Sequence, residues 1–337
     1  MILSNNDILT RIDAALKGIT DVTALGDSIL QPTKFDRFIK AMQHKTVILP
    51  EARYIEMKAQ KADVDRIAFS GRIMKSGTTA AGADRTLSTS EFSSPSTYTN
   101  QLIAKEMQAI VSIKDTAMRR NIEKENFEDT LIQLMGEHAG LDLEEWGLLT
   151  RLNYNTNNDL YLSLTNGWLE LAENKVYGAG ASKDFDPAAA TYPENMFQAM
   201  LDALPKQYLG DLRNWRIYAT FSIMDAYRDI LKARGTALGD AAQTTGDELY
   251  WKGIKIKYCP MLERSKALNV DGAGTVCTLQ NPDNMAWGVF HEVSIERERE
   301  AKERRTDFVL TVEADAHYED ENAAVVAYAD AETGQIS

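Results

Sequence analysis

The sequence predicts an α+β protein in which a compact mixed core carries long extended segments. Three observations lead to this fold class. Residues 46–104 show a strand–loop–strand pattern around Ser76–Thr97, a tract of mostly Ser, Thr, Gly and Ala. A long amphipathic helix is predicted over 121–149, and beyond residue 155 helical and strand-like patterns alternate.

The first 45 residues mix polar turns with short runs of helical spacing, such as Ile8, Leu9, Ile12 and Leu16, and they predict an extended arm with a helical piece. The N-terminus has neither a basic region nor an apolar core typical of a signal peptide. The longest late apolar run, 323–329, is too short to cross a bilayer. We therefore expect a soluble cytoplasmic chain with no membrane partner.

The segment 46–104 predicts a long hairpin. Thr46–Leu49 and Arg66–Met74 alternate as strands do, and pairing is expected to resume at Tyr98–Ile103 and Ala109–Ile113. The tract between them has little apolar surface to bury on its own chain. It is expected to be mobile, or to be ordered by another molecule.

The helix predicted over 121–149 has an apolar stripe of Phe127, Leu131, Leu134, His138, Leu141 and Leu149, and we expect His138 to be a packed core residue. Glu128 and Glu144 fall off this stripe. Gly136 and Gly140 each cost about 1 kcal/mol relative to Ala, so packing must stabilise the helix.

The region after 155 predicts a sheet flanked by helices. Helices are expected from Pro193 and from Ser222, whose hydroxyl is a candidate cap, with strands at 215–219, 254–258 and 275–279. Residues 289–318 predict a long twisted hairpin whose charged turn lies within Ile295–Asp307. Two interpretations of that charge stay open: a solvated hairpin, or an edge that meets a complementary surface on another copy.

Composition and motifs exclude several classes of function. The net charge of −13 argues against a general nucleic-acid coat. Cys259 and Cys277 are expected to be buried thiols. None of the four histidines has a partner at catalytic or metal-binding spacing. The sequence therefore predicts no catalytic residue, no metal and no cofactor.

Two motifs leave a remote enzymatic alternative. Val176–Lys183 begins like a dinucleotide-binding loop, but Lys183 occupies the position of the third glycine. Asn153–Asp159 spaces oxygen ligands as calcium loops do, but Asn158 replaces the turn glycine and Leu164 replaces the closing glutamate. A metal- or nucleotide-dependent enzyme is the function class these motifs would support.

The order of segments resembles that of the major capsid proteins of tailed bacteriophages, which have the Hong Kong 97-type shell fold. The similarity covers most of the chain. The segments that carry it are Ile110–Asp115 before the long helix, Asn166–Leu169, Leu204–Tyr208, Trp215, Ser222–Gly235, Leu249–Met261, Asn281–Gly288 and Phe308–Val325.

The resemblance implies an N-terminal arm (1–45), an extended loop (46–104), a peripheral domain (105–154 and 289–322) with a spine helix at 121–149, and an apical domain with the C-terminal tail (155–288 and 323–337). It implies a structural, non-enzymatic subunit of an icosahedral or prolate phage head, assembled in the host cytoplasm from hexamers and pentamers and enclosing double-stranded DNA without sequence-specific binding. Since the arm begins almost at Met1, a separate scaffolding protein is expected, together with a portal. A cellular encapsulating nanocompartment is the alternative shell.

The expected contacts between subunits join the loop to acidic faces of a second copy. The loop is expected to contribute basic and apolar residues, and the spine helix and the charged hairpin mainly acidic ones. Exposed ion pairs of this kind determine how two subunits align more than how tightly they bind. The candidate contact residues are Arg66, Ile67, Phe69, Arg72, Ile73, Lys75, Arg85, Glu123, Glu128, Glu296, Glu298 and Arg299.

Overall fold

The structure is a computed structural model, and it describes residues 46–69, 72–79, 81–116, 127–152, 160–180, 183–210, 212–234, 248–268 and 276–330. The predicted arm, the calcium-like segment Asn153–Asp159 and the start of the predicted spine helix lie outside these residues. The chain divides into two compact units. One contains Gln108–His138 and Val293–Thr311; the other contains His44–Met107, Ala139–Glu292 and Val312–Ser337.

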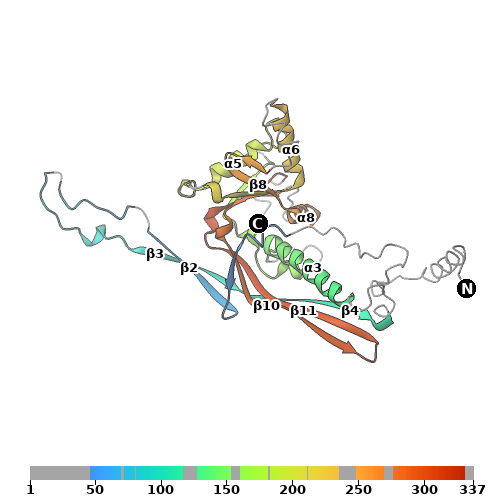
Figure 1. Cartoon of the computed structure of the whole chain (residues 1–337). Coiled ribbons are helices and arrows are strands. Elements are labelled where there is room, and N and C mark those ends of the chain that lie inside the picture. Colours follow the sequence, from blue (N-terminus) through green and yellow to red (C-terminus); the bar gives the residue numbers. More distant parts are fainter. Residues whose placement is uncertain are drawn as a thin grey trace, which may run out of the picture. The chain divides into compact units, whose positions relative to one another are not determined.

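Four strands form the first sheet, in the order β1-β10-β11-β4 (Figure 1). Their bounds are Arg53–Glu56 for β1, Met285–Glu300 for β10, Arg305–Tyr318 for β11 and Lys105–Lys114 for β4. The predicted long hairpin with a charged turn is confirmed, because only 301–304 separates β10 from β11. Phe308, Leu310, Val312 and Ala314 are buried along one side of β11, as their alternation predicts.

Six strands form the second sheet, in the order β5-β12-β9-β6-β8-β7. They are β5 (Asn174–Tyr177), β12 (Ala324–Tyr328), β9 (Val276–Gln280), β6 (Arg216–Ala219), β8 (Ile254–Tyr258) and β7 (Leu249–Trp251). Helices α5 (Glu194–Ala203) and α6 (Phe221–Ala233) pack on one face, where Phe197, Ile217 and Ile223 share a core cluster. The predicted sheet with flanking helices is confirmed.

A second cluster packs the other face of this sheet against helix α3 (Phe127–Leu149). Its centre holds Trp146, Trp168 and Trp287, with the rings of Trp146 and Trp287 edge to face and their centroids 6.0 Å apart. The short helix α4 (Trp168–Leu171) comes close to α3 here. A Cβ on Gly167 would lie 2.8 Å from the Gly147 carbonyl oxygen, so this contact requires glycine. Helix α8 spans Pro260–Leu268.

Two expectations about the long helix are wrong. His138 is exposed and Glu144 is completely buried, although the sequence places His138 on the apolar stripe and Glu144 off it. The reason is that the helix is not buried on one stripe throughout. From Leu143 to Leu149 it is enclosed on every side, so helical periodicity stops distinguishing core from surface.

Three local expectations are also corrected. Thr46–Leu49 is no strand, because its backbone N–H groups bind the Glu144 carboxylate. The first strand of the loop covers 61–69 in place of 66–74. Helix α6 begins after Thr220 without a side-chain cap, and the N–H of Phe221 donates to Glu263, so Ser222 is not its cap.

Candidate functional site

The described residues contain no cluster of three or more His, Cys, Asp or Glu side chains that could bind a metal ion. Cys259 and Cys277 are free and buried, as predicted, and burial raises the pKa of both thiols. No helix among the described residues is both long and apolar enough to span a bilayer. The feature that stands out is the segment between β1 and β4.

That segment is a two-stranded antiparallel ribbon with a long loop at its end (Figure 1). Strand β2 (Lys61–Phe69) pairs with β3 (Pro95–Ile103) through nine residue pairs, from Lys61↔Ile103 to Phe69↔Pro95. The predicted hairpin is therefore confirmed, with its first strand shifted to 61–69 and its second strand longer than predicted. Because paired residues share a face, the register divides the ribbon into two faces that differ in chemistry.

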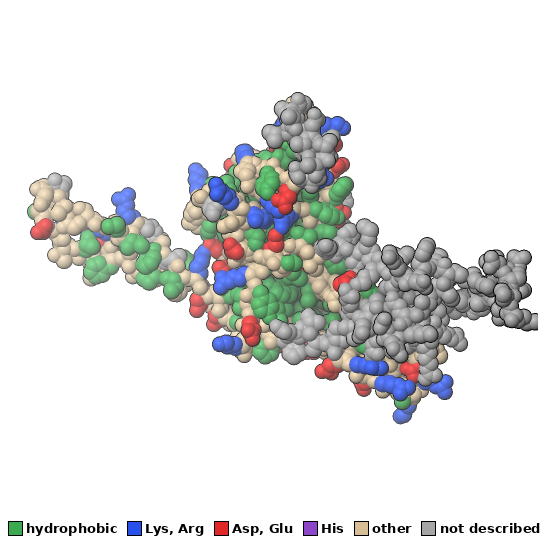
Figure 2. Space-filling model, in the orientation of Figure 1, with side chains coloured by type: hydrophobic (Ala, Val, Ile, Leu, Met, Phe, Trp, Pro, Cys, Tyr) green, Lys and Arg blue, Asp and Glu red, His purple; other side chains and the backbone are tan. Residues whose placement is uncertain are grey.

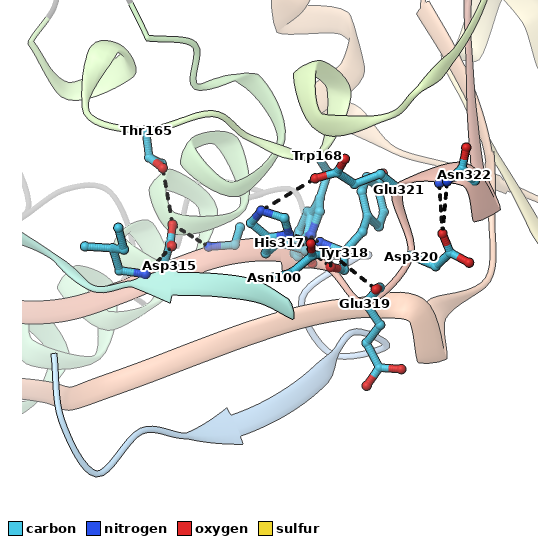
Figure 3. A network of polar contacts seen from close by, with 12 residues as sticks. Asn100, Thr165, Trp168, Asp315, His317, Tyr318, Glu319, Asp320, Glu321 and Asn322 are labelled. Atoms are coloured by element: carbon cyan, nitrogen blue, oxygen red, sulfur yellow. Dashed lines mark hydrogen bonds and ion pairs between the residues drawn. The ribbon is translucent and has the colours of Figure 1, made fainter. Parts of the chain in front are cut away.

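The base of the ribbon is fixed to its own chain at the end of β11. The backbone N–H of Ile103 donates to Asp315 Oδ2 at 2.7 Å, and Asn100 Nδ2 donates to the Tyr318 carbonyl oxygen at 2.8 Å (Figure 3). Leu102 is completely buried in a small cluster with Met57. Gly288 makes room for them, since a Cβ there would lie 2.9 Å from Leu102.

Asp315 is 3 % exposed, and burial raises the pKa of its carboxyl group. Hydrogen bonds from Ile103, Ala316 and Thr165 oppose that shift. Around it, Trp168 Nε1 donates to the carbonyl of His317 at 3.0 Å (Figure 3). The exit of the loop, the end of β11 and helix α4 are thus held by one polar network.

Asp320 makes the second attachment of the ribbon. Its carboxylate forms an ion pair with Arg66 and accepts a hydrogen bond from the hydroxyl of Tyr208. The Arg66 guanidinium also lies over the ring of Tyr98, 4.9 Å from its centroid. Arg66 was predicted to contact a second copy, and in this chain it holds the ribbon in place.

The opposite face of the ribbon is turned away from these attachments. Ile67 is 67 % exposed and Phe69 50 % exposed, two positions apart on the same face. Figure 2 shows hydrophobic side chains lying open along the ribbon. Beyond β2, Arg72, Ile73 and Lys75 are exposed as well. A lone ribbon has no core to cover such side chains, and an exposed apolar patch indicates a binding surface.

The tip of the loop has local structure of its own. Ser88 and Glu91 form a capping box around the short helix Thr89–Glu91. The Ser88 N–H and the guanidinium of Arg85 lower the pKa of Glu91 to about 2. Arg85, a predicted contact residue, is therefore ion-paired within the loop.

The charged hairpin carries three further predicted residues, Glu296, Glu298 and Arg299. Arg299 Nη2 lies 3.0 Å from Asp115 Oδ2, and Glu296 and Glu298 are exposed. Glu123 lies outside the described residues, as does the side chain of Glu128. The sequence did not predict the roles of Asn100, Asp315 and Asp320, because their partners are distant in the chain. The one signal for this attachment was the strand-like alternation that begins at Lys61, which indicates that the ribbon starts close to its base.

Comparison with solved structures identifies the class of fold. The chain superposes on the capsid of an empty GTA particle (TM-score 0.59, 13 % identity, 88 % of this chain and 100 % of that chain). It also superposes on the satellite phage P4 procapsid (TM-score 0.55, 12 % identity, 84 % and 95 %). The capsid of Myoviridae phage XM1 gives a TM-score of 0.54 at 11 % identity (86 % and 94 %). The predicted Hong Kong 97-type fold is confirmed.

One curated relative is similar along nearly the whole sequence. A putative prophage capsid protein of Bacillus subtilis, YqbE, is 28 % identical over 323 residues, covering 95 % of this chain and 97 % of its own. A scan against models of protein families finds no match. The predicted resemblance to phage capsid shell proteins is confirmed by this relative and by the fold.

Proposed function

We propose that this protein is the structural subunit of a phage head. The observation that carries the proposal is a capsid-type fold in which the ribbon exposes Ile67 and Phe69 on the face opposite its attachments to its own chain. Copies assemble in the host cytoplasm into hexamers and pentamers. They enclose double-stranded DNA without reading its sequence, with a separate scaffolding protein and a portal.

The physical basis is association through many weak contacts. In a closed shell each subunit repeats the same contacts with several neighbours. Burying two exposed apolar side chains contributes about 1.5–3 kcal/mol each at most. Once several neighbours hold a subunit, each further contact is effectively intramolecular, so modest contacts produce a persistent shell.

Nine of the twelve predicted contact residues are proposed to touch a second copy directly. Ile67, Phe69, Arg72, Ile73 and Lys75 are exposed on the loop and are proposed to touch a second copy. Glu296 and Glu298 are proposed contacts of the charged hairpin, and Glu123 and Glu128 of the spine.

Three other predicted residues, Arg66, Arg85 and Arg299, have carboxylate partners within the chain. Their proposed role is to hold the loop and the hairpin in the conformation that a neighbour receives.

Electron microscopy of the expressed protein tests this function. The wild type should form closed polyhedral shells or capsomers. A variant in which Asn-Gly replaces 69–95 should remain a soluble folded subunit that forms no shells, because it keeps eight of the nine ribbon pairs, ending at Ala68↔Ser96, but loses the loop. Leu160→Ser, which alters a 79 % exposed side chain outside the ribbon, is the control and should assemble normally. Normal shells from the loop-deleted variant would contradict the role given to the loop.

A further inference from the structure

The outward face of the ribbon carries charge and apolar surface in a fixed order. From base to tip, β2 presents Asp63, Asp65, Ile67 and Phe69 on this face, since the register pairs them with Gln101, Thr99, Thr97 and Pro95. All four β2 side chains lie on the face opposite Leu102, which is buried against the chain itself. Acidic residues therefore precede the apolar pair.

No basic side chain in the described part of the chain forms an ion pair with Asp63 or Asp65. Asp63 Oδ1 accepts from Gln101 Nε2 at 3.0 Å and Asp65 Oδ1 accepts from Thr99 Oγ1 at 2.7 Å, and both donors are neutral. Lys61 lies at the base of the same face, so 61–65 carries a net charge of −1. These hydrogen bonds link the two strands of the ribbon, and they do not neutralise the negative charge at its base.

Two basic residues, Arg72 and Lys75, follow the apolar pair in the loop beyond β2, on either side of the exposed Ile73 and Met74. Arg72 and Lys75 are exposed, and no carboxylate in the described part of the chain forms an ion pair with either. This distinguishes them from Arg66 and Arg85, whose guanidinium groups are paired internally. Along the chain the order is thus acidic, apolar, basic.

Along the sequence, the acidic and the basic residues lie at similar distances on the two sides of the apolar pair, and they carry opposite charges. The acidic residues are centred on position 64 and the basic ones near 73–74, so the midpoint falls between 68 and 69, next to Phe69. A surface that meets its own copy across a two-fold axis must place each group opposite its complement. Acidic groups on one side and basic groups on the other satisfy this requirement, with the apolar residues at the centre.

We propose that the outward face of the ribbon, together with the exposed loop residues Arg72 and Lys75, docks on the same residues of a second copy about a two-fold axis. Asp63 and Asp65 of each copy then lie opposite Arg72 and Lys75 of the other, and Ile67 and Phe69 of the two copies pack between them. The inference deepens the proposed function and rests on it, because it names the partner surface of the loop. It gives Arg72 and Lys75 a neighbouring ribbon as partner, in place of the acidic residues of the spine or the charged hairpin.

Charge reversal distinguishes this contact from every other arrangement. D63K/D65K and R72E/K75E should each impair shell assembly, because either variant alone places like charges opposite each other at both ends of the contact. We expect the subunit concentration at half assembly to rise about tenfold or more, which corresponds to 1.4 kcal/mol or more. An equimolar mixture of the two variants should assemble, since each introduced lysine of one variant then faces an introduced glutamate of the other.

Further variants separate folding and net charge from docking. D63N/D65N removes the charges and retains side-chain oxygens for Gln101 and Thr99, so it should fold as the wild type and assemble more weakly. D225K/D229K makes the same change in net charge as D63K/D65K, at exposed positions on α6, and should assemble normally.

Several outcomes would overturn the inference. Normal assembly of either D63K/D65K or R72E/K75E would do so, and so would a mixture of the two that fails to assemble. Assembly of the combined variant D63K/D65K/R72E/K75E without assembly of the mixture would place the ion pairs within one chain. Rescue of R72E/K75E by E296K/E298K would make the charged hairpin the partner. Wild-type protein that forms no shells under any condition would instead refute the proposed function itself.

Discussion

The carboxylate of Glu144 accepts a 2.9 Å hydrogen bond from the backbone N–H of Ile48, and both residues are completely buried. The same oxygen accepts from Val47 at 2.7 Å and from Leu49 at 3.3 Å. Three consecutive N–H groups at the entry of the extended segment therefore converge on one side chain of α3. Asp315 holds the exit of that segment in a similar way, through the N–H of Ile103.

Glu144→Gln should destabilise the unassembled subunit by about 1–3 kcal/mol, because a neutral amide oxygen replaces the carboxylate that accepts from three N–H groups, and the NH₂ group is buried beside the Cys259 thiol. Urea-induced unfolding followed by tryptophan fluorescence measures the loss, since Trp146 lies two positions from Glu144 on the same helix. Glu173→Gln, at an exposed position, is the matched control and should change stability by less than about 0.5 kcal/mol. Equal stability of the two variants would show that the three N–H groups do not depend on the carboxylate.

The dependence of stability on pH should report on Asp315. Burial raises the pKa of this carboxyl in the folded chain above its ordinary value of 3.8. The folded state therefore binds its proton more tightly than the unfolded state. The resulting stabilisation is fully present below pH 3.8 and is lost as pH rises through the raised pKa.

Asp315→Asn removes this titration while an amide oxygen can still accept from Ile103. The free energy of unfolding of the wild type minus that of Asp315→Asn should thus decrease as pH rises above 3.8. Denaturant unfolding at a series of pH values measures the difference. Carboxyls whose pKa values are lowered, such as Glu91, contribute equally to both proteins and cancel. A difference that stays constant or grows with pH would contradict the burial argument.

Asn100→Asp should loosen the ribbon at its base. The Asn100 amide donates to the carbonyl oxygens of Tyr318 and Glu319, at 2.8 and 3.2 Å, and a carboxylate there would face both carbonyls without a proton to share. We expect a cost of about 1–3 kcal/mol. Hydrogen exchange of the amides in 98–103 should accelerate by one to two orders of magnitude.

Thr97→Asp is the matched control for that experiment, because it adds the same charge to the same strand at an exposed position. Its exchange near the base should remain that of the wild type. If both variants accelerate exchange equally, added charge on the ribbon explains the effect and the two hydrogen bonds do not.

The parts of the fold that sequence predicts well are those in which local pattern and tertiary environment agree. Met196, Phe197 and Met200 recur with helical spacing and are all buried in α5. Alternation in β11 likewise matches its burial. The failures arise where a distant residue decides. Thr46–Leu49 alternates as a strand does, yet its N–H groups bind a carboxylate 95 to 97 residues away.

The candidate site shows the same limit. The exposure of Ile67 and Phe69 follows from a loop that has too little apolar surface to fold on itself, so sequence could indicate it. The internal partners of Arg66 and Arg299 could not be predicted, because Asp320 and Asp115 are brought to them only by the strand pairing. The sequence shows where a charged residue stands but not which residue it pairs with. That pairing decides whether the charged side chain is free to contact a second copy.

Close packing between α3 and α4 gives the last prediction. A Cβ on Gly167 would lie 2.8 Å from the Gly147 carbonyl oxygen and 2.9 Å from the carbonyl carbon of Leu148, and both of these are backbone atoms that no rotamer change can move. Gly167→Ala should therefore push α4 away from α3 and cost about 1–3 kcal/mol. Trp168 follows immediately and is fully buried against the core, so near-ultraviolet circular dichroism should weaken together with thermal stability. Gly210→Ala is the control, because a Cβ at that position meets no atom within 4 Å and should leave both measurements unchanged. Wild-type stability in Gly167→Ala would mean that the two helices separate at little cost, and that the tryptophan cluster does not depend on their contact.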